Sequence, residues 1–272
     1  MDNTYNASTK EYEMEFTFLG SPYRGCGLES SLARLEDYES DEIASLVEGG
    51  LIKNFNRFYA HSSTEPIDPS CVTNVWALMS LMQHNGCPTR LVEWTFNPNV
   101  ALYFACENAS YSGDDGEVWF VQPSALMEMQ RRQFTDELTR INVTCPNFEQ
   151  QQEALGWFEP AVDPKDLVRC FVQCLSKFDA LSEESGPALN FFIPPRFDER
   201  MVNQCTVFSV VSSPLISADY VLSMYPGCVR RLIIPNFLKG VLHDTLDVMG
   251  VHERMLFPGL GGLSAALTRY FT

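Results

Sequence analysis

The stretch QHNGCPTRLVEWTFNPNVALYFA (residues 83–105) contains the end of one predicted helix, a short strand and the start of a second helix. Gly86 suits the position just past the first helix, because glycine readily adopts the left-handed backbone that ends helices, and Pro88 prevents continuation. Asn97 followed by Pro98 is typical of a helix start, with the asparagine as N-cap and the proline in the first turn. The segment TRLVEWT between these signals predicts a strand.

Outside this stretch, helical and strand patterns follow one another without the regular strand–helix–strand order of a doubly wound sheet. Strands are expected at MEFTFLG (14–20), EVWFVQP (117–123), LNFFIP (189–194), CTVFSVV (205–211) and VRRLIIP (229–235). Helices are expected at 30–38, at 41–60 with an interruption at Gly49-Gly50, and at 71–86, 124–133, about 149–158, 164–177, 237–250 and 262–271. Such a mixture indicates an α+β fold.

The composition limits the partners of the protein. The chain has 272 residues and a formal net charge of −16. A surface this acidic repels nucleic-acid backbones and anionic membranes, so we expect neither general nucleic-acid binding nor membrane association. A small anionic ligand stays compatible with this charge, because one well-placed arginine can hold a phosphate against a distant negative field. No apolar run resembles a signal peptide or a membrane span.

Nine cysteines are spread along the chain without a CxxC pair. Most lie in apolar runs such as YFACENA, so we interpret them as reduced thiols and expect a cytoplasmic protein. Cys170 and Cys174 have the spacing of one helix face, but no histidine lies near them in the sequence. We therefore expect no metal site.

The opening stretch also places five residues with polar or aromatic side chains close together: Thr89, Arg90, Glu93, Trp94 and Thr95. In a structural interpretation, Arg90 pairs with Glu93, while Trp94 fills the core and Thr95 helps to form the turn. In a functional interpretation, the same side chains line a binding site between the two helices. The residues alone leave both interpretations open, because ionic clusters arise in structural as well as functional sites.

Two separated motifs resemble the FRG domain, a family of prokaryotic and phage-encoded modules named for a Phe-Arg-Gly motif. Tyr23-Arg24-Gly25 resembles this first motif, and the stretch 83–105 resembles the family pattern QH-x-G-x-PTRLLDWT-x-NP-x-x-ALYFA. Further along, RMVNQCTVF (200–208) is similar to the family's R-x-x-x-Q-x-G-x-F. The segment 232–260 is similar to the closing strand and helix of the family. The chain departs from the pattern where Tyr23 replaces Phe, Cys26 replaces Gln, Glu93 replaces Asp and Thr206 replaces Gly.

The FRG layout resembles that of ADP-ribosyltransferases, which implies mixed, mostly antiparallel sheets flanked by helices. It also implies a cleft for an NAD-like nucleotide, with Arg24 on the phosphates and Thr95 on the nicotinamide side. Gln204 would take the place of the acidic catalytic residue. Because glutamine is neutral, either the site binds NAD without efficient turnover or another carboxylate, such as Glu93, acts instead. The implied ligand-binding residues are Tyr23, Arg24, Gly25, Thr89, Arg90, Trp94 and Thr95.

The resemblance implies one FRG-type domain over residues 15–272, after a flexible N-terminus at 1–14 and with a variable helical insertion around 125–190. The first functional hypothesis is a nucleotide-binding domain with an NAD-like cleft in bacterial stress or phage defence, which leaves open whether the domain only binds the nucleotide or is an NAD-cleaving or ADP-ribosyltransferase-type enzyme. The alternative is a non-catalytic module for an unidentified protein partner, in which Arg24 and Glu93 form a structural ion pair. The nucleotide hypothesis requires that Arg24 meets Trp94 and Thr95 in a single pocket.

Overall fold

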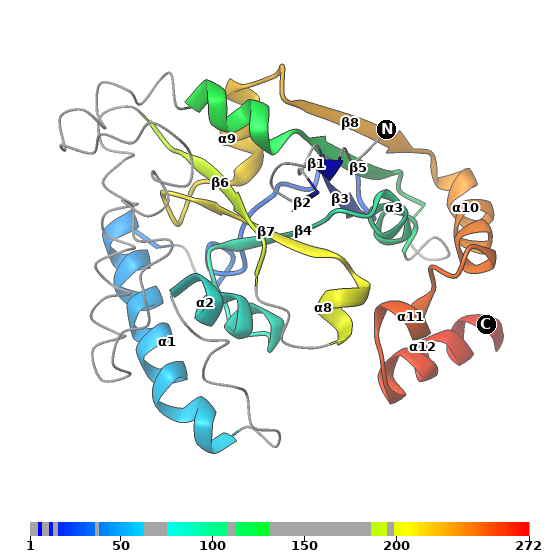
Figure 1. Ribbon diagram of the computed structural model, residues 1–272, viewed down its shortest axis with the longest axis horizontal. Helices are drawn as coiled ribbons and strands as arrows, with labels where there is room; N and C mark the ends of the chain where they lie inside the picture. The colour runs from blue at the N-terminus through cyan, green and yellow to red at the C-terminus, as the bar shows by residue number, and fades with distance from the viewer. Residues whose placement is uncertain are drawn as a thin grey trace.

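The computed structural model describes residues 5–6, 11–12, 16–35, 38–62, 75–107, 113–130, 186–194 and 199–271. A six-stranded sheet with the order β6-β7-β4-β3-β5-β8 crosses the centre of this structure (Figure 1). Its strands are β3 (Thr17–Ser21), β4 (Leu91–Thr95), β5 (Gly116–Val121), β6 (Leu189–Phe192), β7 (Thr206–Val211) and β8 (Val229–Ile234). Two short strands, β1 (Tyr5–Asn6) and β2 (Glu11–Tyr12), pair with each other. The expected α+β class is therefore confirmed, and each described pairing in the large sheet is antiparallel.

Helices cover both faces of the sheet. They are α1 (Asp41–Ser62), α2 (Val75–His84), α3 (Pro98–Cys106), α8 (Glu199–Asn203), α9 (Ala218–Met224), α10 (Asn236–Val248), α11 (Glu253–Leu256) and α12 (Leu260–Phe271), and residues 123–130 are also helical. Because side chains alternate along a strand, Leu91 of β4 packs with α1 and α2 on one face. Trp94 of the same strand packs with α9 on the other face.

Helix α3 lies directly on the strands because two glycines let it approach. A Cβ atom at Gly20 of β3 would collide with the carbonyl oxygen of Ala101, and one at Gly116 of β5 would collide with the carbonyl oxygen of Ala105. The start of α3 is the one expected from the sequence, since the side chain of Asn97 accepts a hydrogen bond from the backbone of Asn99. These contacts hold α3 beside the centre of the sheet.

The sheet is open between its two central strands. β3 and β4 pair at one position, Phe18 with Thr95, whereas β3 pairs with β5 at five positions and β4 with β7 at five. If the register continued, Gly20 would lie opposite Glu93, but the strands separate there. The halves β6-β7-β4 and β3-β5-β8 therefore meet at a single residue pair, and the edges of β3 and β4 face an opening.

Two predicted features of the helices are wrong. The segment 30–38 forms turns at residues 31–35 instead of a helix, because Ser31 Oγ and the backbone N–H of Leu32 both donate to the Thr89 carbonyl (3.1 and 3.0 Å). These tertiary hydrogen bonds replace the local ones of a helix.

Helix α1, by contrast, runs without interruption through Gly49 and Gly50. Its fully buried side chains, including Ala44 and Ile52, supply packing that outweighs a cost of about 1 kcal/mol for each glycine. The helices predicted at about 149–158 and 164–177 lie outside the described residues, as does most of the insertion predicted around 125–190.

Candidate functional site

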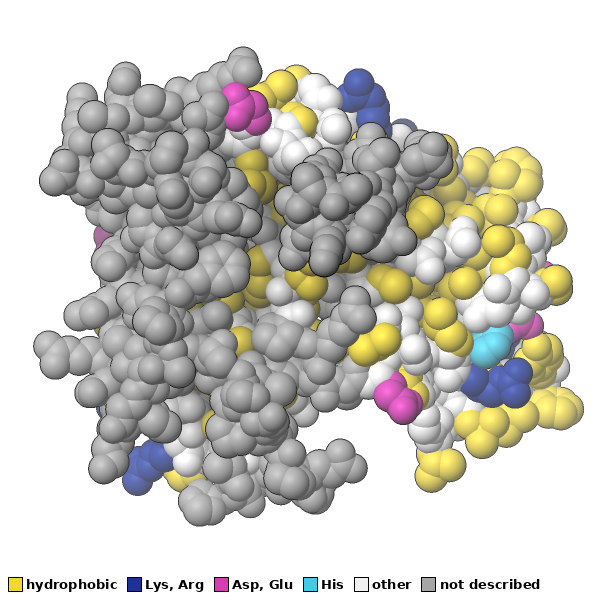
Figure 2. Space-filling view, viewed as in Figure 1, with side chains coloured by type: hydrophobic (Ala, Val, Ile, Leu, Met, Phe, Trp, Pro, Cys, Tyr) yellow, Lys and Arg dark blue, Asp and Glu magenta, His cyan; other side chains and the backbone are white. Residues whose placement is uncertain are grey.

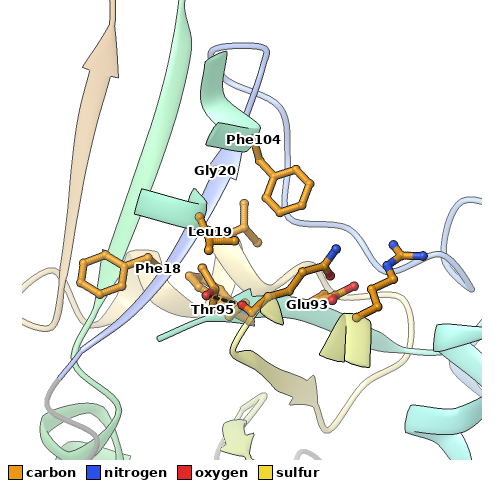
Figure 3. Close-up of a pocket in the computed structure, with 10 residues that line it drawn as sticks. Phe18, Leu19, Gly20, Glu93, Thr95 and Phe104 are labelled. Carbon is orange, nitrogen blue, oxygen red and sulfur yellow. Dashed lines mark hydrogen bonds between the residues drawn. The ribbon is translucent and has the colours of Figure 1, made fainter. Parts of the chain in front are cut away.

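A cavity of about 270 Å³ lies at the opening between β3 and β4 (Figure 3). It is lined by Phe18, Leu19 and Gly20 of β3, Glu93, Trp94 and Thr95 of β4, Val100 and Phe104 of α3, and Arg200 and Gln204. A second cavity of about 260 Å³ shares Leu19, Gly20 and Glu93 with the first. Mainly apolar walls with a few polar groups are typical of sites for small molecules.

Thr95 and Gln204 form a hydrogen-bonded corner of the cavity. Thr95 Oγ1 donates to the Gln204 carbonyl (2.6 Å) and accepts from the backbone N–H of Asn97 (3.0 Å). The side chain of Gln204 is buried, and its Nε2 donates to the Leu256 carbonyl (3.0 Å). The corner therefore connects three elements: β4, the end of α8, and α11. The amide nitrogen of Gln204 already donates its hydrogen bond within the protein.

Glu93 supplies the carboxylate of the opening. Its side chain is exposed, and its Oε1 accepts a hydrogen bond from Thr206 Oγ1 of the neighbouring strand (3.2 Å). Figure 3 shows Glu93 and Thr95 on one side of the cavity, with Phe104 of α3 on the other. Since Glu93 lines both cavities, a ligand in either one would lie next to a negative charge.

Arg200 supplies the guanidinium of the first cavity, and it was not among the site residues expected from the sequence. It lies on α8 four residues before Gln204, so one helical turn brings both side chains to the same wall. Its guanidinium carbon lies 5.1 Å from the ring centre of Phe257, and Arg200 also lines a broader groove of about 690 Å³ beside α12. The R-x-x-x-Q spacing at 200–204 was the signal that could have identified it.

Tyr23, Arg24 and Gly25 line neither cavity, although Pro22 and Cys26 on either side of the motif line the second one. After β3 the backbone N–H of Arg24 donates to the carbonyl of Asp115, the residue before β5 (2.8 Å). The N–H of Gly25, which has a positive φ of 77°, donates to Glu117 Oε1 (3.2 Å). These bonds fix the backbone of the motif next to the start of β5.

Arg24 consequently does not meet Trp94 and Thr95, and this part of the prediction was wrong. Its side chain is 63% exposed, and its NH1 lies 3.9 Å from Asp115 Oδ2. The alternative pairing of Arg24 with Glu93 is also wrong, because the acidic partner of Arg24 in the structure is Asp115. Tyr23 is exposed and, like Gly25, lines neither cavity of the opening.

Thr89 and Arg90 hold the fold together behind the opening. Arg90 is buried with Glu48 of α1, at 2.7 Å from Nε to Oε2 and 2.5 Å from NH2 to Oε2, so the expected pairing with Glu93 is replaced. Thr89 Oγ1 donates to Gln83 Oε1 (2.7 Å). Trp94 donates from Nε1 to Ser209 Oγ (2.8 Å) and also lines the first cavity.

Comparison with known families identifies the N-terminal part of the chain. The family model of the FRG domain matches residues 14–114. These residues belong to the FRG domain family. The matched part of the FRG domain includes β3, β4 and α3, which supply most of the cavity wall, whereas Arg200 and Gln204 lie beyond it. No curated protein and no solved structure matches the chain. The ADP-ribosyltransferase-like layout and the extension of one domain to residue 272 therefore stay predictions.

Three further sequence expectations concern metal ligands, cysteines and membrane-spanning helices. In the part of the chain that the structure describes, no three His, Cys, Asp or Glu side chains are arranged to hold a metal ion. Within the same ranges, five cysteines are free: Cys26, Cys87, Cys106, Cys205 and Cys228. Cys170 and Cys174 lie outside the described residues. No helix among those described is long and apolar enough to cross a membrane.

A buried ionic cluster joins the last three helices. Arg269 of α12 donates to both carboxylate oxygens of Glu253 (2.7 and 3.1 Å) and lies 3.2 Å from Asp247. Burial is the largest single effect and would raise the pKa of Glu253, but hydrogen bonds from Arg269 and from the backbone, together with the charges of Arg269 and His243, hold the pKa below its usual value. Burial, followed by the charge of Arg269, lowers the pKa of His243 of α10. The folded protein therefore favours charged Glu253 and neutral His243.

Proposed function

We propose that the opening between β3 and β4 binds a nucleotide of the NAD class, with Arg200 holding its phosphates. The observation that supports this proposal is the separation of the two strands after Phe18 and Thr95, which leaves a cavity in the middle of an otherwise continuous sheet. The apolar walls suit a ring, and a guanidinium offers a bidentate grip on phosphate. This assignment gives Arg200 the role that the resemblance implied for Arg24.

The two adjoining cavities suit a ligand with separate parts. Their volumes of about 270 and 260 Å³ are each near the lower end for small-molecule sites, which hold about 300–1,000 Å³, and together they fall within that range. The second cavity is lined by polar side chains such as Ser31, Arg34 and Gln83, whereas the first offers Phe104 and Leu19. A nucleotide likewise combines an apolar ring with a polar sugar and phosphates.

The chemistry proposed for this site is cleavage of the nicotinamide–ribose bond with transfer of the ADP-ribosyl group. As that bond breaks, its electron pair leaves with nicotinamide and positive charge develops on the ribose, until a nucleophile adds to the same carbon. Glu93 is the carboxylate of the opening that would stabilise this charge. Gln204 is neutral and bonded to Leu256, so its role is to position Thr95 and the cavity wall.

A binding experiment with matched arginine variants tests the site. We would measure the thermal shift and the binding isotherm of the full chain with NAD, ADP-ribose and ATP. Arg200→Ala should abolish the shift, because it removes the phosphate contact, and Arg200→Lys should weaken it by losing the bidentate geometry. Arg24→Ala is the control, since that exposed side chain lies outside both cavities.

The outcomes separate two assignments of the phosphate-binding residue. If Arg24→Ala removes binding and Arg200→Ala keeps it, the role implied by the sequence motif is right and this proposal is wrong. An absence of any shift with all three nucleotides at millimolar concentration would rule out the nucleotide site. For the chemistry, nicotinamide release should require Glu93, so Glu93→Gln should retain NAD binding while release falls by roughly 100-fold or more.

A further inference from the structure

Large apolar side chains gather on the outer surface of α10 and α12. Figure 2 shows them on the right of the molecule, where Figure 1 places α10, α11 and α12. We define the C-terminal apolar face by the exposed residues Phe237, Val241, Val248, Met249, Leu260, Leu263, Leu267, Tyr270 and Phe271. None of these residues lines the cavity between β3 and β4.

Helix α12 is turned with its small residues inward and its large residues outward. Its two buried residues are Gly262 and Ala266, whereas Leu260 is 84% and Phe271 87% exposed. A Cβ atom at Gly262 would collide with the carbonyl oxygen of Phe257, so the helix packs tightly against the chain before it. The bonds from its last turn to Glu253 hold the other end. The helix cannot rotate to bury its leucines without breaking these contacts.

This arrangement leaves α12 with little packing of its own. A helix of 12 residues is marginally stable in water, and helices in proteins gain most of their stability from a buried apolar face. The exposed residues Leu260, Leu263, Leu267 and Tyr270 follow one another at intervals of three, four and three residues. This is the spacing of side chains that meet a second helix along a seam.

The size of the C-terminal apolar face suits an interface. From their exposed fractions, its side chains present on the order of 1,000 Å² of surface. The largest apolar patch on a typical monomer measures about 300–600 Å². Each partner in a standard protein interface contributes roughly 800 Å². The summed exposed area of the face is therefore comparable with what each partner contributes to a standard interface, and it is sufficient for a stable dimer.

The charge distribution indicates where on the surface two copies of the chain can approach each other. The chain carries a net charge of −16, so two copies repel each other over most of their surfaces. Helix α12 has no acidic residue, and its one arginine is already bonded to Glu253 and Asp247. We infer that the C-terminal apolar face is the contact between two copies of this chain, related by a two-fold axis that pairs α12 with its counterpart.

Sedimentation equilibrium and light scattering of the full chain test this inference. At micromolar concentration the wild-type mass should be twice the chain mass of 30.8 kDa. The double variant Leu260→Ser/Leu267→Ser should raise the dimer dissociation constant by roughly tenfold or more, because it removes apolar area from the seam. Leu46→Ser is the matched control, since Leu46 is also a helical leucine and is 76% exposed, but lies on α1.

Two additional measurements keep the test decisive. Phe271→Ser, at the last exposed position of α12, should also weaken the dimer, and circular dichroism should show unchanged helix content in every variant. Raising the salt concentration should tighten the wild-type dimer, because it screens the repulsion between two acidic chains. A monomeric wild-type chain, a dimer that both α12 variants leave intact, or a dimer that salt dissociates would overturn the inference.

Discussion

The buried ion pair between Arg90 and Glu48 leads to a prediction that separates a structural role of Arg90 from the ligand-binding role suggested by its motif. Both side chains are about 1% exposed. Arg90 bonds to Glu48 through its guanidinium and its backbone N–H, and NH1 also donates to the Ser212 carbonyl (3.3 Å). We expect Glu48→Gln to destabilise the protein strongly, because it removes the carboxylate charge that Arg90 bonds to in a buried site.

The expected loss in the free energy of unfolding follows from the burial of the pair and from the number of hydrogen bonds lost. Removing one member of a buried ion pair costs about 3–5 kcal/mol, which for a chain of this size lowers the melting temperature by about 10 °C. Replacing both residues in Glu48→Leu/Arg90→Met removes both charges. It leaves two backbone groups, the N–H of residue 90 and the Ser212 carbonyl, without these partners, at about 1 kcal/mol each. The double variant should therefore be more stable than either single variant.

Urea unfolding, followed by tryptophan fluorescence and circular dichroism, measures the free energies for this double-mutant cycle. The single variants Glu48→Leu and Arg90→Met should each show the full loss, and the double variant Glu48→Leu/Arg90→Met should recover part of it. Below its melting temperature, Arg90→Met should bind NAD as the wild type does, since Arg90 lines none of the cavities around the opening. A loss of less than about 1 kcal/mol in Arg90→Met, or loss of NAD binding without loss of stability, would refute the reasoning.

Two further predictions concern packing and pH. Gly20→Ala should destabilise the fold by several kcal/mol in urea unfolding, because the added methyl group meets the backbone of α3. Gly49→Ala in α1, where a methyl group meets nothing, should stabilise the fold by about 0.5–1 kcal/mol. Equal effects of the two substitutions would contradict the packing argument. Because the folded state lowers the pKa of His243, the unfolded state binds a proton at higher pH than the folded state does. The free energy of unfolding should therefore fall as the pH decreases below the ordinary histidine pKa of about 6.5. It should level off once the pH is below the lowered pKa of the folded state. Urea unfolding of His243→Gln across this range should show a flatter dependence, and an unchanged slope would contradict the assignment.

The motif around β4 was predictable because its signals act locally. Asn97 caps α3 and Gly86 has a positive φ of 77°, as their positions in the sequence indicated. Four residues that the resemblance placed together, Glu93, Trp94, Thr95 and Gln204, do line one cavity. The first three lie on one strand, and Gln204 reaches them because the register of β4 with β7 places Thr206 beside Thr95.

The position of Arg24 could not be predicted in the same way. The motif Tyr23-Arg24-Gly25 correctly marked the end of β3, but nothing near it specifies where its backbone then bonds. Glu117 of β5 decides this by accepting from the N–H of Gly25, and Lys239 of α10 adds a bond from Nζ to the Pro22 carbonyl (2.7 Å). These partners lie about 90 and more than 200 residues further along the chain.

The amino-acid sequence by itself determined the α+β class, the membership of residues 14–114 in the FRG domain family, and most strand and helix positions. These depend on side-chain periodicity, helix caps and motif spacing, which act over a few residues. Only the tertiary structure decided that Arg200 instead of Arg24 faces the cavity, that Arg90 is buried with Glu48, and that α12 exposes its leucines. The reason is that burial and charge pairing depend on which distant segments fold against each other, and local sequence does not specify that choice.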